Sequence, residues 1–284
     1  KVNGTDKSSL ITTTGSNLGW LTIPGITSIT SLFWGVSPAG AETCSISAIE
    51  VDGKLLVDSG VSVANVPTVA STVRSSPESG FSIVTYTGGS STPANSDSGD
   101  SFGHGLGASP KLVICKNRTG GNSWPVYHAS TALGALVLDG DNAIDTASYL
   151  FAQKHPTSSV VYLGNNPEIN NSSENYVAYC FAPVEGYSAF GSYVGNGGSS
   201  GNGPFVYTGF KTRWVMMKAS SPNHAGSWVM YDTTRDTASS GEGWLYANSA
   251  ASEQAAATYA VHTTSNGFRM AGTSAENNGS GRTY

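Results

Sequence analysis

The sequence carries little charge. Asp, Glu, Lys and Arg together make up 12% of its 284 residues, against roughly 25% in an average globular protein. Helical proteins build their surfaces from these residues, so their scarcity argues against a helical fold. The chain instead contains 35 glycines and many serines, threonines and asparagines, which favour turns. Since aromatic residues reach 10%, the composition indicates a packed, β-rich protein rather than a disordered one.

The sequence also lacks clusters of basic residues and long apolar runs. Its net charge is −5, and no block of Lys or Arg supplies the positive surface that a nucleic-acid-binding protein needs. No stretch approaches the roughly 18 consecutive apolar residues of a membrane-spanning helix. These absences predict no nucleic-acid partner and no membrane insertion.

Cysteine is scarce and odd in number. The three cysteines, Cys44, Cys115 and Cys180, are too few for a disulfide framework. The apolar sequences "LVICK" and "VAYCF" around two of them predict small buried thiols, and nothing in the sequence supports a bridge between Cys115 and Cys180. No Cys-x-x-Cys pair or Cys/His cluster has zinc spacing. The sequence therefore predicts no metal and no cofactor.

One short phrase occurs twice in the sequence. "NSWPVYHAS" begins at Asn122 and "GSWVMYDTT" at Gly226, which places their Trp and Tyr residues 104 positions apart. Three further blocks align in the same order: "GHGLGASPKLVICKN" with "PFVYTGFKTRWVMMKAS", "VVYLGNN" with "GFRMAGTS", and "NNSSENYVAY" with "NNGSGRTY". The gaps between blocks fall in Gly, Ser and Asn stretches, where loops tolerate insertion. The pattern predicts two homologous tandem modules of about 105 residues each.

These blocks predict three domains. We expect an N-terminal β-rich domain at residues 1–78, module 1 at residues 79–187 and module 2 at residues 188–284. In module 1, Tyr176 leads into "VAYCFAPVEGY", which reads as a closing strand, whereas the matching block of module 2 stops at Tyr284. We therefore expect module 2 to be incomplete at its C-terminal end and the sequence to be a fragment of a longer protein.

Short apolar segments separated by glycine-containing turns predict the fold class. They indicate an all-β protein of tandem β-sandwich-like modules. The "VDGK" sequence between apolar alternations indicates a hairpin, and only residues 249–260 have helical propensity. The expected strands are residues 81–87, 111–117, 124–129, 135–139, 159–163, 176–182, 190–194, 213–218, 227–232, 243–247, 266–270 and 282–284.

Several of these motifs resemble a known group of phage proteins. "GFSIVTYTG", "GHGLGASPKLVICKNR", "NYVAYCFAPVEGYSAFGSYVGNG" and "GPFVYTGFKTRWVMMK" are similar to a tandem module of large structural proteins of tailed bacteriophages, especially marine phages and cyanophages, usually described as tail-fibre-like. The resemblance covers residues 79–284. It implies a virion component displayed outside the particle, made in the bacterial host and trimeric if it is a fibre. It supplies no catalytic residues.

Motifs that could carry chemistry have simpler explanations. "GHGLG" (103–107) precedes a strand rather than a helix, so it predicts a turn in which the His104 ring bonds locally, not a dinucleotide site. "DGDNAID" (139–145) lacks the remaining ligands of an EF-hand and reads as a turn. No HExxH or GxSxG motif occurs, and the counterpart of His128 in module 2 is Asp232. The sequence therefore predicts no catalytic residues and no enzyme activity.

Aromatic residues are the remaining candidates for contacts with a receptor. In "SWPVYH", the alternation of a strand places Trp124 and Tyr127 on opposite faces, and we expect the Trp to face the module core. Aromatic rings provide large contact area at little entropic cost. The candidate receptor contacts are Tyr127, His128, Tyr231, Asp232 and Trp244.

The sequence thus favours a non-enzymatic virion structural protein, part of a tail fibre or similar appendage. Its expected partners are other virion proteins, further copies of itself in a homotrimer, and host-surface polysaccharide or protein. A surface rich in hydroxyl and amide groups suits such contacts without strong steering fields. Two alternatives remain open: a capsid- or tail-associated decoration protein without a receptor role, and a polysaccharide depolymerase, which would need two carboxylates at glycosidase spacing.

Overall fold

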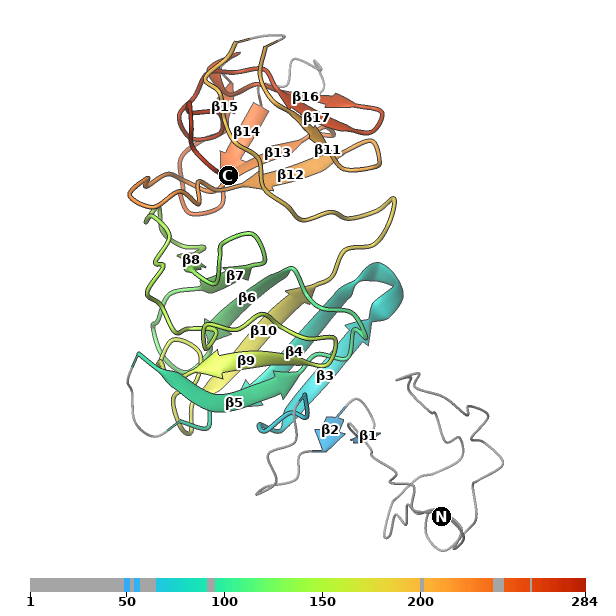
Figure 1. Ribbon diagram of the computed structural model, residues 1–284, viewed down its shortest axis with the longest axis vertical. Helices are drawn as coiled ribbons and strands as arrows, with labels where there is room; N and C mark the ends of the chain where they lie inside the picture. Colours follow the sequence, from blue (N-terminus) through green and yellow to red (C-terminus); the bar gives the residue numbers. More distant parts are fainter. Residues whose placement is uncertain are drawn as a thin grey trace, which may run out of the picture. The chain divides into compact units, whose positions relative to one another are not determined.

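The structure is a computed structural model that describes residues 49–51, 54–56, 65–90, 95–199, 202–236, 243–255 and 257–284 (Figure 1). Residues Ala48–Tyr284 form one compact unit, which contains all the strands named below. Cys44 and residues 1–48 of the expected N-terminal domain lie outside the described residues.

The described residues confirm the all-β fold class. Their regular structure consists of strands paired in antiparallel sheets and two short 3₁₀ turns, Pro77–Ser79 and Ala257–Tyr259. The helical propensity of residues 249–260 produces no α-helix in the part that the structure describes. Instead β15 (Gln254–Ala255) pairs with β14 (Gly243–Tyr246), because sheet pairing outweighs a weak local propensity.

The largest sheet contains most of module 1. Its strands, in spatial order, are β1 (Ile49–Val51), β2 (Lys54–Leu56), β3 (Ser71–Ser76), β4 (Phe81–Thr87), β10 (Asn175–Phe181), β6 (Leu112–Asn117), β7 (Pro125–His128) and β8 (Ala135–Val137). The pairing of Val51 with Lys54 confirms the hairpin that "VDGK" predicts. A two-stranded ribbon of β5 (Asp97–Gly103) and β9 (Val160–Gly164) lies across this sheet (Figure 1).

The boundary between the first two expected domains differs from the sequence-based expectation. β3 lies before residue 79, yet it pairs with β4 along its whole length, from Ser71 opposite Tyr86 to Ser76 opposite Phe81. The turn Pro77–Ser79 joins the two strands, with Gly80 in the left-handed conformation at φ 65°. The segment up to residue 78 therefore contributes strands to the sheet of module 1.

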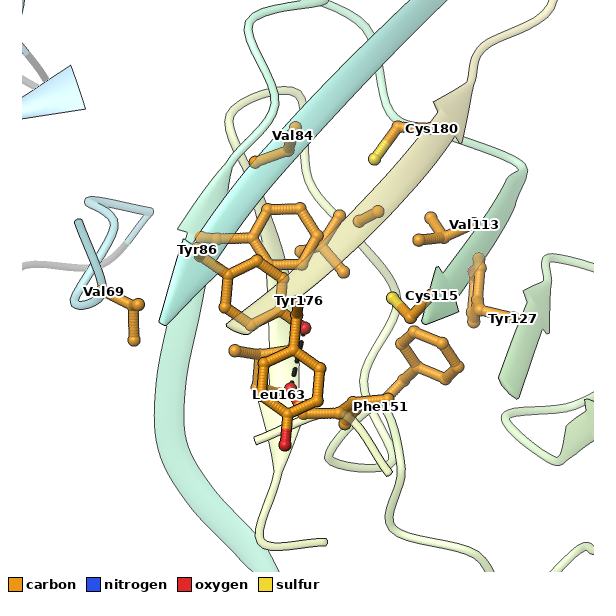
Figure 2. Packing of buried hydrophobic residues seen from close by; sticks show 14 of the residues in the cluster. Val69, Val84, Tyr86, Val113, Cys115, Tyr127, Phe151, Leu163, Tyr176 and Cys180 are labelled. Carbon is orange, nitrogen blue, oxygen red and sulfur yellow. Dashed lines mark hydrogen bonds between the residues drawn. The ribbon is translucent and has the colours of Figure 1, made fainter. Parts of the chain in front are cut away.

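The core of module 1 lies between the large sheet and the β5–β9 ribbon. Tyr86 stacks on Phe102 and on Tyr176, with ring centroids 4.9 and 5.2 Å apart. Figure 2 shows Tyr86 and Tyr176 in the same core cluster as Cys115 and Cys180. Cys115 and Cys180 are free and buried, which confirms the predicted thiols. Burial raises the pKa of the Cys115 thiol to about 12, so it stays protonated and unreactive.

Module 2 consists of two smaller sheets. One contains β11 (Phe205–Tyr207), β17 (Gly267–Met270) and β16 (Val261–Thr264), and the other contains β12 (Trp214–Met217), β13 (Val229–Asp232), β14 and β15. Their facing sides enclose the buried side chains of Val215, Met217, Val229, Tyr231, Trp244, Val261, Phe268 and Met270. Residues 190–194, expected as a strand, form only the isolated bridge between Val194 and Thr283 among the described residues.

Each module contains a stacked pair of tyrosines in which one ring donates a hydrogen bond to a backbone carbonyl. The Tyr86 and Tyr176 rings stack at 5.2 Å and 14°, and the Tyr193 and Tyr284 rings stack at 5.2 Å and 18°. In each pair the tyrosine that comes first in the chain also donates a hydrogen bond to a backbone carbonyl. Tyr86 Oη donates to the Ile169 carbonyl at 2.7 Å (dashed in Figure 2), and Tyr193 Oη donates to the Asn277 carbonyl at 2.6 Å.

The hydrogen bonds around the repeated Trp also correspond. The Trp124 amide donates to Asp139 Oδ1 at 2.9 Å, and the Trp228 amide donates to Asn248 Oδ1 at 2.8 Å. In both copies of the phrase the Trp amide is therefore bound by a side-chain oxygen from a later segment, Asp139 in one case and Asn248 in the other.

The modules are joined through a buried contact that involves Trp228. Its ring packs against Val126, Leu136 and Ile144 of module 1, and its Nε1 donates to the Val137 carbonyl at 2.7 Å. Residues on the outward face of the β6–β7–β8 part of the sheet are thereby covered by module 2. The junction is hydrophobic and hydrogen-bonded, which is typical of parts that move together.

Lys218 completes this junction. Its Nζ donates to the carbonyls of Asn142, Asp141 and Gly226 at 2.8, 3.2 and 2.6 Å, and the residue is only 5% exposed. Three carbonyls satisfy the three donors of the ammonium group. Two of them come from module 1, so the contact fixes the orientation of the segment 139–145 against module 2.

Candidate functional site

Three of the five predicted receptor contacts lie in the module cores. Tyr127, Tyr231 and Trp244 are 2%, 4% and 1% exposed, so their rings cannot touch a partner on this fold. The structure corrects the prediction for these residues: the face of each strand that carries them points inward, and a large aromatic ring at such a position is a packing residue.

The two buried tyrosines are fully engaged by their own modules. The Tyr127 hydroxyl lies 2.8 Å from His155 Nδ1, and the Tyr231 hydroxyl donates to Asp236 Oδ2 at 3.1 Å. Burial is the main cause that raises the pKa of each phenol to about 12. Neither hydroxyl is therefore ionised or free for chemistry at neutral pH.

His128 and Asp232 are partly exposed, but they act locally. His128 Nδ1 accepts a hydrogen bond from the Ser130 amide at 3.2 Å, and Asp232 Oδ1 accepts one from the Thr234 amide at 2.7 Å. Both residues end their strands and shape the following turn, as short polar side chains commonly do. Burial lowers the pKa of His128, which keeps the ring neutral at pH 7.

The repeated Trp lies on the outward face of its strand. Val126 and Tyr127 belong to different hydrophobic clusters, which confirms that neighbouring residues of this strand face opposite ways. The expectation that Trp faces the module core is wrong, because Tyr occupies the inward position. Trp124 is only half-buried, whereas Trp228 is buried against module 1.

Polar groups of module 1 gather around Trp124. Lys116 Nζ lies 5.6 Å from the centre of the Trp124 ring and donates to the Asn122 carbonyl. Burial raises the pKa of Glu168, the nearby Asp139 raises it further, and Lys116 opposes both. The repeat pattern aligns Lys116 with Lys218, but it does not predict a site role for Lys116 or Glu168.

Module 2 exposes an aromatic face on its three-stranded sheet. Tyr207 and Phe205 on β11 are 71% and 44% exposed, while Val206 between them points to the core. Arg269 lies directly opposite Phe205, and His262 lies opposite Arg269, so these four side chains share one face. We call the set Phe205, Tyr207, His262 and Arg269 the aromatic face.

Gly267 gives the aromatic face its shape. It pairs with Tyr207, and a Cβ atom placed on it would lie 3.2 Å from Phe205 Cζ and 2.1 Å from the Val206 carbonyl oxygen. The Phe205 ring therefore leans over a position that has no side chain. The module 1 positions that align with Phe205 and Tyr207 are Ser101 and Gly103, so this face belongs to module 2 alone.

The remaining polar motifs serve as turns. His104 is fully buried: Nδ1 accepts from the Leu106 amide at 3.3 Å and Nε2 bonds the Thr157 carbonyl at 3.2 Å, which confirms the predicted local role. Asp145 Oδ1 accepts from the Ala147 amide. Within the described ranges, no group of three His, Cys, Asp or Glu residues could hold a metal ion, and no helix is long and apolar enough to cross a membrane.

Comparison with known proteins places most of this chain in one family. A family model described as a domain of unknown function, DUF7483, matches residues 56–284. The match takes in both modules and the strand β3 that precedes them, as the compact unit of the structure does. No curated protein and no solved structure matches the chain.

Proposed function

Since the chain belongs to the DUF7483 family, whose description assigns no activity, we propose a function from the geometry of its modules. The protein is a non-enzymatic structural component of a phage virion, part of a tail fibre or similar external appendage. It contributes to attachment to the host surface and works as a homotrimer. The observation that carries the proposal is the aromatic face on a module that is firmly joined to its neighbour.

The junction suits mechanical display. A protein that holds a contact surface away from a particle needs modules that do not collapse onto one another. Burial of Trp228 and the three hydrogen bonds of Lys218 hold module 2 to module 1. Such a joint keeps the aromatic face in a defined direction relative to module 1.

The aromatic face has the chemistry of a polysaccharide contact. Phe205 and Tyr207 offer apolar ring surfaces against which the C–H face of a sugar packs, and solvent-exposed rings of this size commonly mark binding sites. Arg269 and His262 on the same face carry hydrogen-bond donors for hydroxyl groups. A single aromatic face with few charges binds a polysaccharide weakly. Three copies of this face in a trimer would raise the avidity for the polysaccharide.

Replacement of the aromatic pair is expected to weaken binding. We predict that Phe205→Ala and Tyr207→Ala each reduce binding of the recombinant chain to an array of bacterial capsular and lipopolysaccharide glycans by about tenfold, the usual effect of truncating an interface anchor. Because both side chains are exposed, each change alters stability by about 0.5 kcal/mol or less. Fluorescently labelled protein on the array measures the binding.

Tyr187 provides the matched control. It is 69% exposed and lies outside the aromatic face, so Tyr187→Ala should bind glycans as the unchanged chain does. Equal binding by all variants would remove the aromatic face as the contact. Absence of binding to the array and to host cells, with normal incorporation into particles, would favour the decoration role instead.

One observation favours a polysaccharide depolymerase as a second candidate. Asp139 and Glu168 interact electrostatically beside the half-exposed Trp124 ring, and the pKa of Glu168 is raised by burial. A carboxylic acid with a raised pKa next to a second carboxylate is the combination that glycoside hydrolysis uses. An aromatic ring at the same place would support a sugar.

Release of reducing ends distinguishes the two candidates. For the non-enzymatic proposal we predict no release above background when the chain is incubated with a panel of bacterial capsular polysaccharides. A depolymerase would release reducing ends, and Glu168→Gln would lower the rate by about 100-fold or more, as loss of a general acid does. Asp145→Asn, which changes a carboxylate in the turn segment 139–145, is the control and should leave the rate of reducing-end release unchanged.

A further inference from the structure

The segments that build the aromatic face carry positive charge and no carboxylate. Residues 186–231 and 254–275, which include β11, β16 and β17, contain no Asp or Glu. The whole chain has 19 of these residues and a net charge of −5. Outside the junction, the cationic residues of the two segments are Lys211, Arg213 and Arg269. The three-stranded sheet is therefore built from segments whose formal charge is opposite in sign to that of the chain.

The register of the sheet places one of these cations beside an aromatic ring. Arg269 on β17 lies directly opposite Phe205 on β11, and His262 on β16 lies opposite Arg269. Side chains that lie opposite one another on one face have Cβ atoms about 4.5–5.5 Å apart. The aromatic ring, the guanidinium and the imidazole therefore form a row across the sheet, in that order.

A second row crosses the sheet beside the first. Tyr207, Gly267 and Thr264 lie opposite one another in the same register. Since Phe205 Cζ lies 3.2 Å from the place that a Cβ atom on Gly267 would take, the Phe205 ring leans along the sheet and presents a face to a ligand. Tyr207 and Thr264 add hydroxyl groups. The two rows together offer ring surface on β11 and hydrogen-bond donors on β17 and β16.

Lys211 adds a second cation close to the end of β11. It is exposed, and it lies in the turn that follows the strand. Thr208 Oγ1 donates to the Phe210 carbonyl at 2.8 Å and lies 3.2 Å from Thr212 Oγ1. These bonds fix the conformation of the turn, so the Lys211 ammonium stays near the Tyr207 end of the aromatic face.

We propose that the aromatic face binds acidic polysaccharides: one sugar ring packs on Phe205, and the carboxylate attached to that ring pairs with Arg269. The inference rests on the proposed attachment role and names the ligand class of the same face. A guanidinium offers a carboxylate two parallel N–H donors. Because a uronic acid carries its carboxylate directly on the ring, both groups of one sugar meet neighbouring side chains of the first row. Lys211 attracts the next uronate of the polymer.

Alginate and hyaluronan, each compared with its carboxyl-reduced form, test the ligand class. Reduction converts every uronate into a neutral sugar and leaves the rings and linkages in place. We expect the full chain to bind the acidic forms at least about tenfold more tightly at low ionic strength, the effect of one charge-assisted contact. Added salt should reduce this preference, because ions screen exposed charges. Biolayer interferometry on immobilised polysaccharide measures the binding.

Single substitutions separate the charges from the rings. Arg269→Gln should weaken binding of the acidic forms by about tenfold and leave binding of the reduced forms unchanged, whereas Phe205→Ala should weaken both. Lys211→Gln changes an exposed side chain, so the fold is retained, and should weaken only the acidic forms, by about threefold. The matched control is Arg74→Gln, which makes the same change of charge at an exposed position of β3 and should leave binding of both forms unchanged.

The outcomes distinguish failure of this inference from failure of the attachment role. Equal binding of the acidic and reduced forms would overturn the acidic class and leave the attachment role standing. So would binding to the glycan array or to host cells without binding to either form. An acid preference that survives in both Arg269→Gln and Lys211→Gln would overturn the assignment to this face. A chain that binds neither form, nor the array, nor host cells would overturn the inference and the attachment role together.

Discussion

Trp228→Ala is expected to lower the free energy of unfolding by about 3–5 kcal/mol, the range observed when a large buried aromatic side chain is removed. The ring is 6% exposed and packs on Val126, Leu136 and Ile144 of module 1. The substitution leaves a cavity and also leaves the Val137 carbonyl without its donor. Urea denaturation, followed by fluorescence and circular dichroism, measures the loss.

The two copies of the repeated phrase provide the control for this prediction. Trp124 holds the corresponding place in module 1 but is only half-buried, so Trp124→Ala should cost about 1 kcal/mol or less. Trp228→Phe keeps most of the apolar contact and loses the hydrogen bond, for an expected cost of about 1–2 kcal/mol. Similar losses for Trp124→Ala and Trp228→Ala would mean that the junction contributes little.

The same variant reports on coupling between modules. If the junction makes the unit unfold cooperatively, Trp228→Ala should split one transition into two, since each module retains its own core. A single transition that merely shifts to lower urea concentration would show that coupling rests on other contacts, such as those of Lys218.

The strands with regular alternation could be predicted from the sequence. Residues 81–87 are expected as a strand and form β4. Residues 176–182 are expected as a strand too, and the period of two in β10 puts Ala178 and Cys180 on one face, where both are fully buried. These predictions succeed because burial on one face of a strand imposes a period of two. The turn role of His104 followed from the glycines around it.

Strands defined by tertiary contacts could not be predicted in this way. β5, "DSGDSFG", has a polar, glycine-containing sequence, and it is held by pairing with β9. Residues 190–194 have a suitable sequence but lack pairing partners among the described residues for most of their length. In both cases the neighbouring strand decides the conformation, and a single sequence window does not contain that information.

The candidate site was predicted less well than the fold. The repeated Trp and Tyr were recognised, yet alternation only shows that they face opposite ways, and it does not show which face is the core. The outward face of Trp228 is buried because module 1 covers it. The exposed residues Phe205 and Tyr207 lie where the two copies differ from one another. An alignment of the repeats identifies shared residues and therefore does not identify these two.

His104 should make the protein lose stability as pH falls below about 6.5. Its ring is fully buried, and this burial lowers the pKa of the imidazole to about 4 from an ordinary 6.5. Between these two pH values the unfolded chain binds a proton at His104 that the folded chain does not bind. The free energy of unfolding therefore has its full value above pH 6.5 and decreases as the pH falls towards 4. The shift corresponds to about 3 kcal/mol at the acid limit.

The tautomer explains why the proton is excluded. Nδ1 accepts a hydrogen bond from the Leu106 amide, so the ring proton resides on Nε2, where it can be donated to the Thr157 carbonyl. Protonation of Nδ1 would place two donors against each other and would put a charge in the core of module 1. The opposed donors and the desolvation of the buried charge both disfavour the charged form.

His104→Asn provides a test that separates this proton from other acid effects. An Asn side-chain oxygen can accept from the amide two residues on, as Nδ1 does, and it does not titrate. We expect the variant to have a free energy of unfolding about 1–3 kcal/mol lower at pH 7.5, and to lose little further stability between pH 6.5 and 4.5. His128→Gln is the matched control, because His128 is only partly buried and a change there should leave most of the acid sensitivity in place. Urea denaturation at pH 7.5, 5.5 and 4.5 measures each variant, and an unchanged pH dependence in His104→Asn would show that the acid sensitivity arises elsewhere.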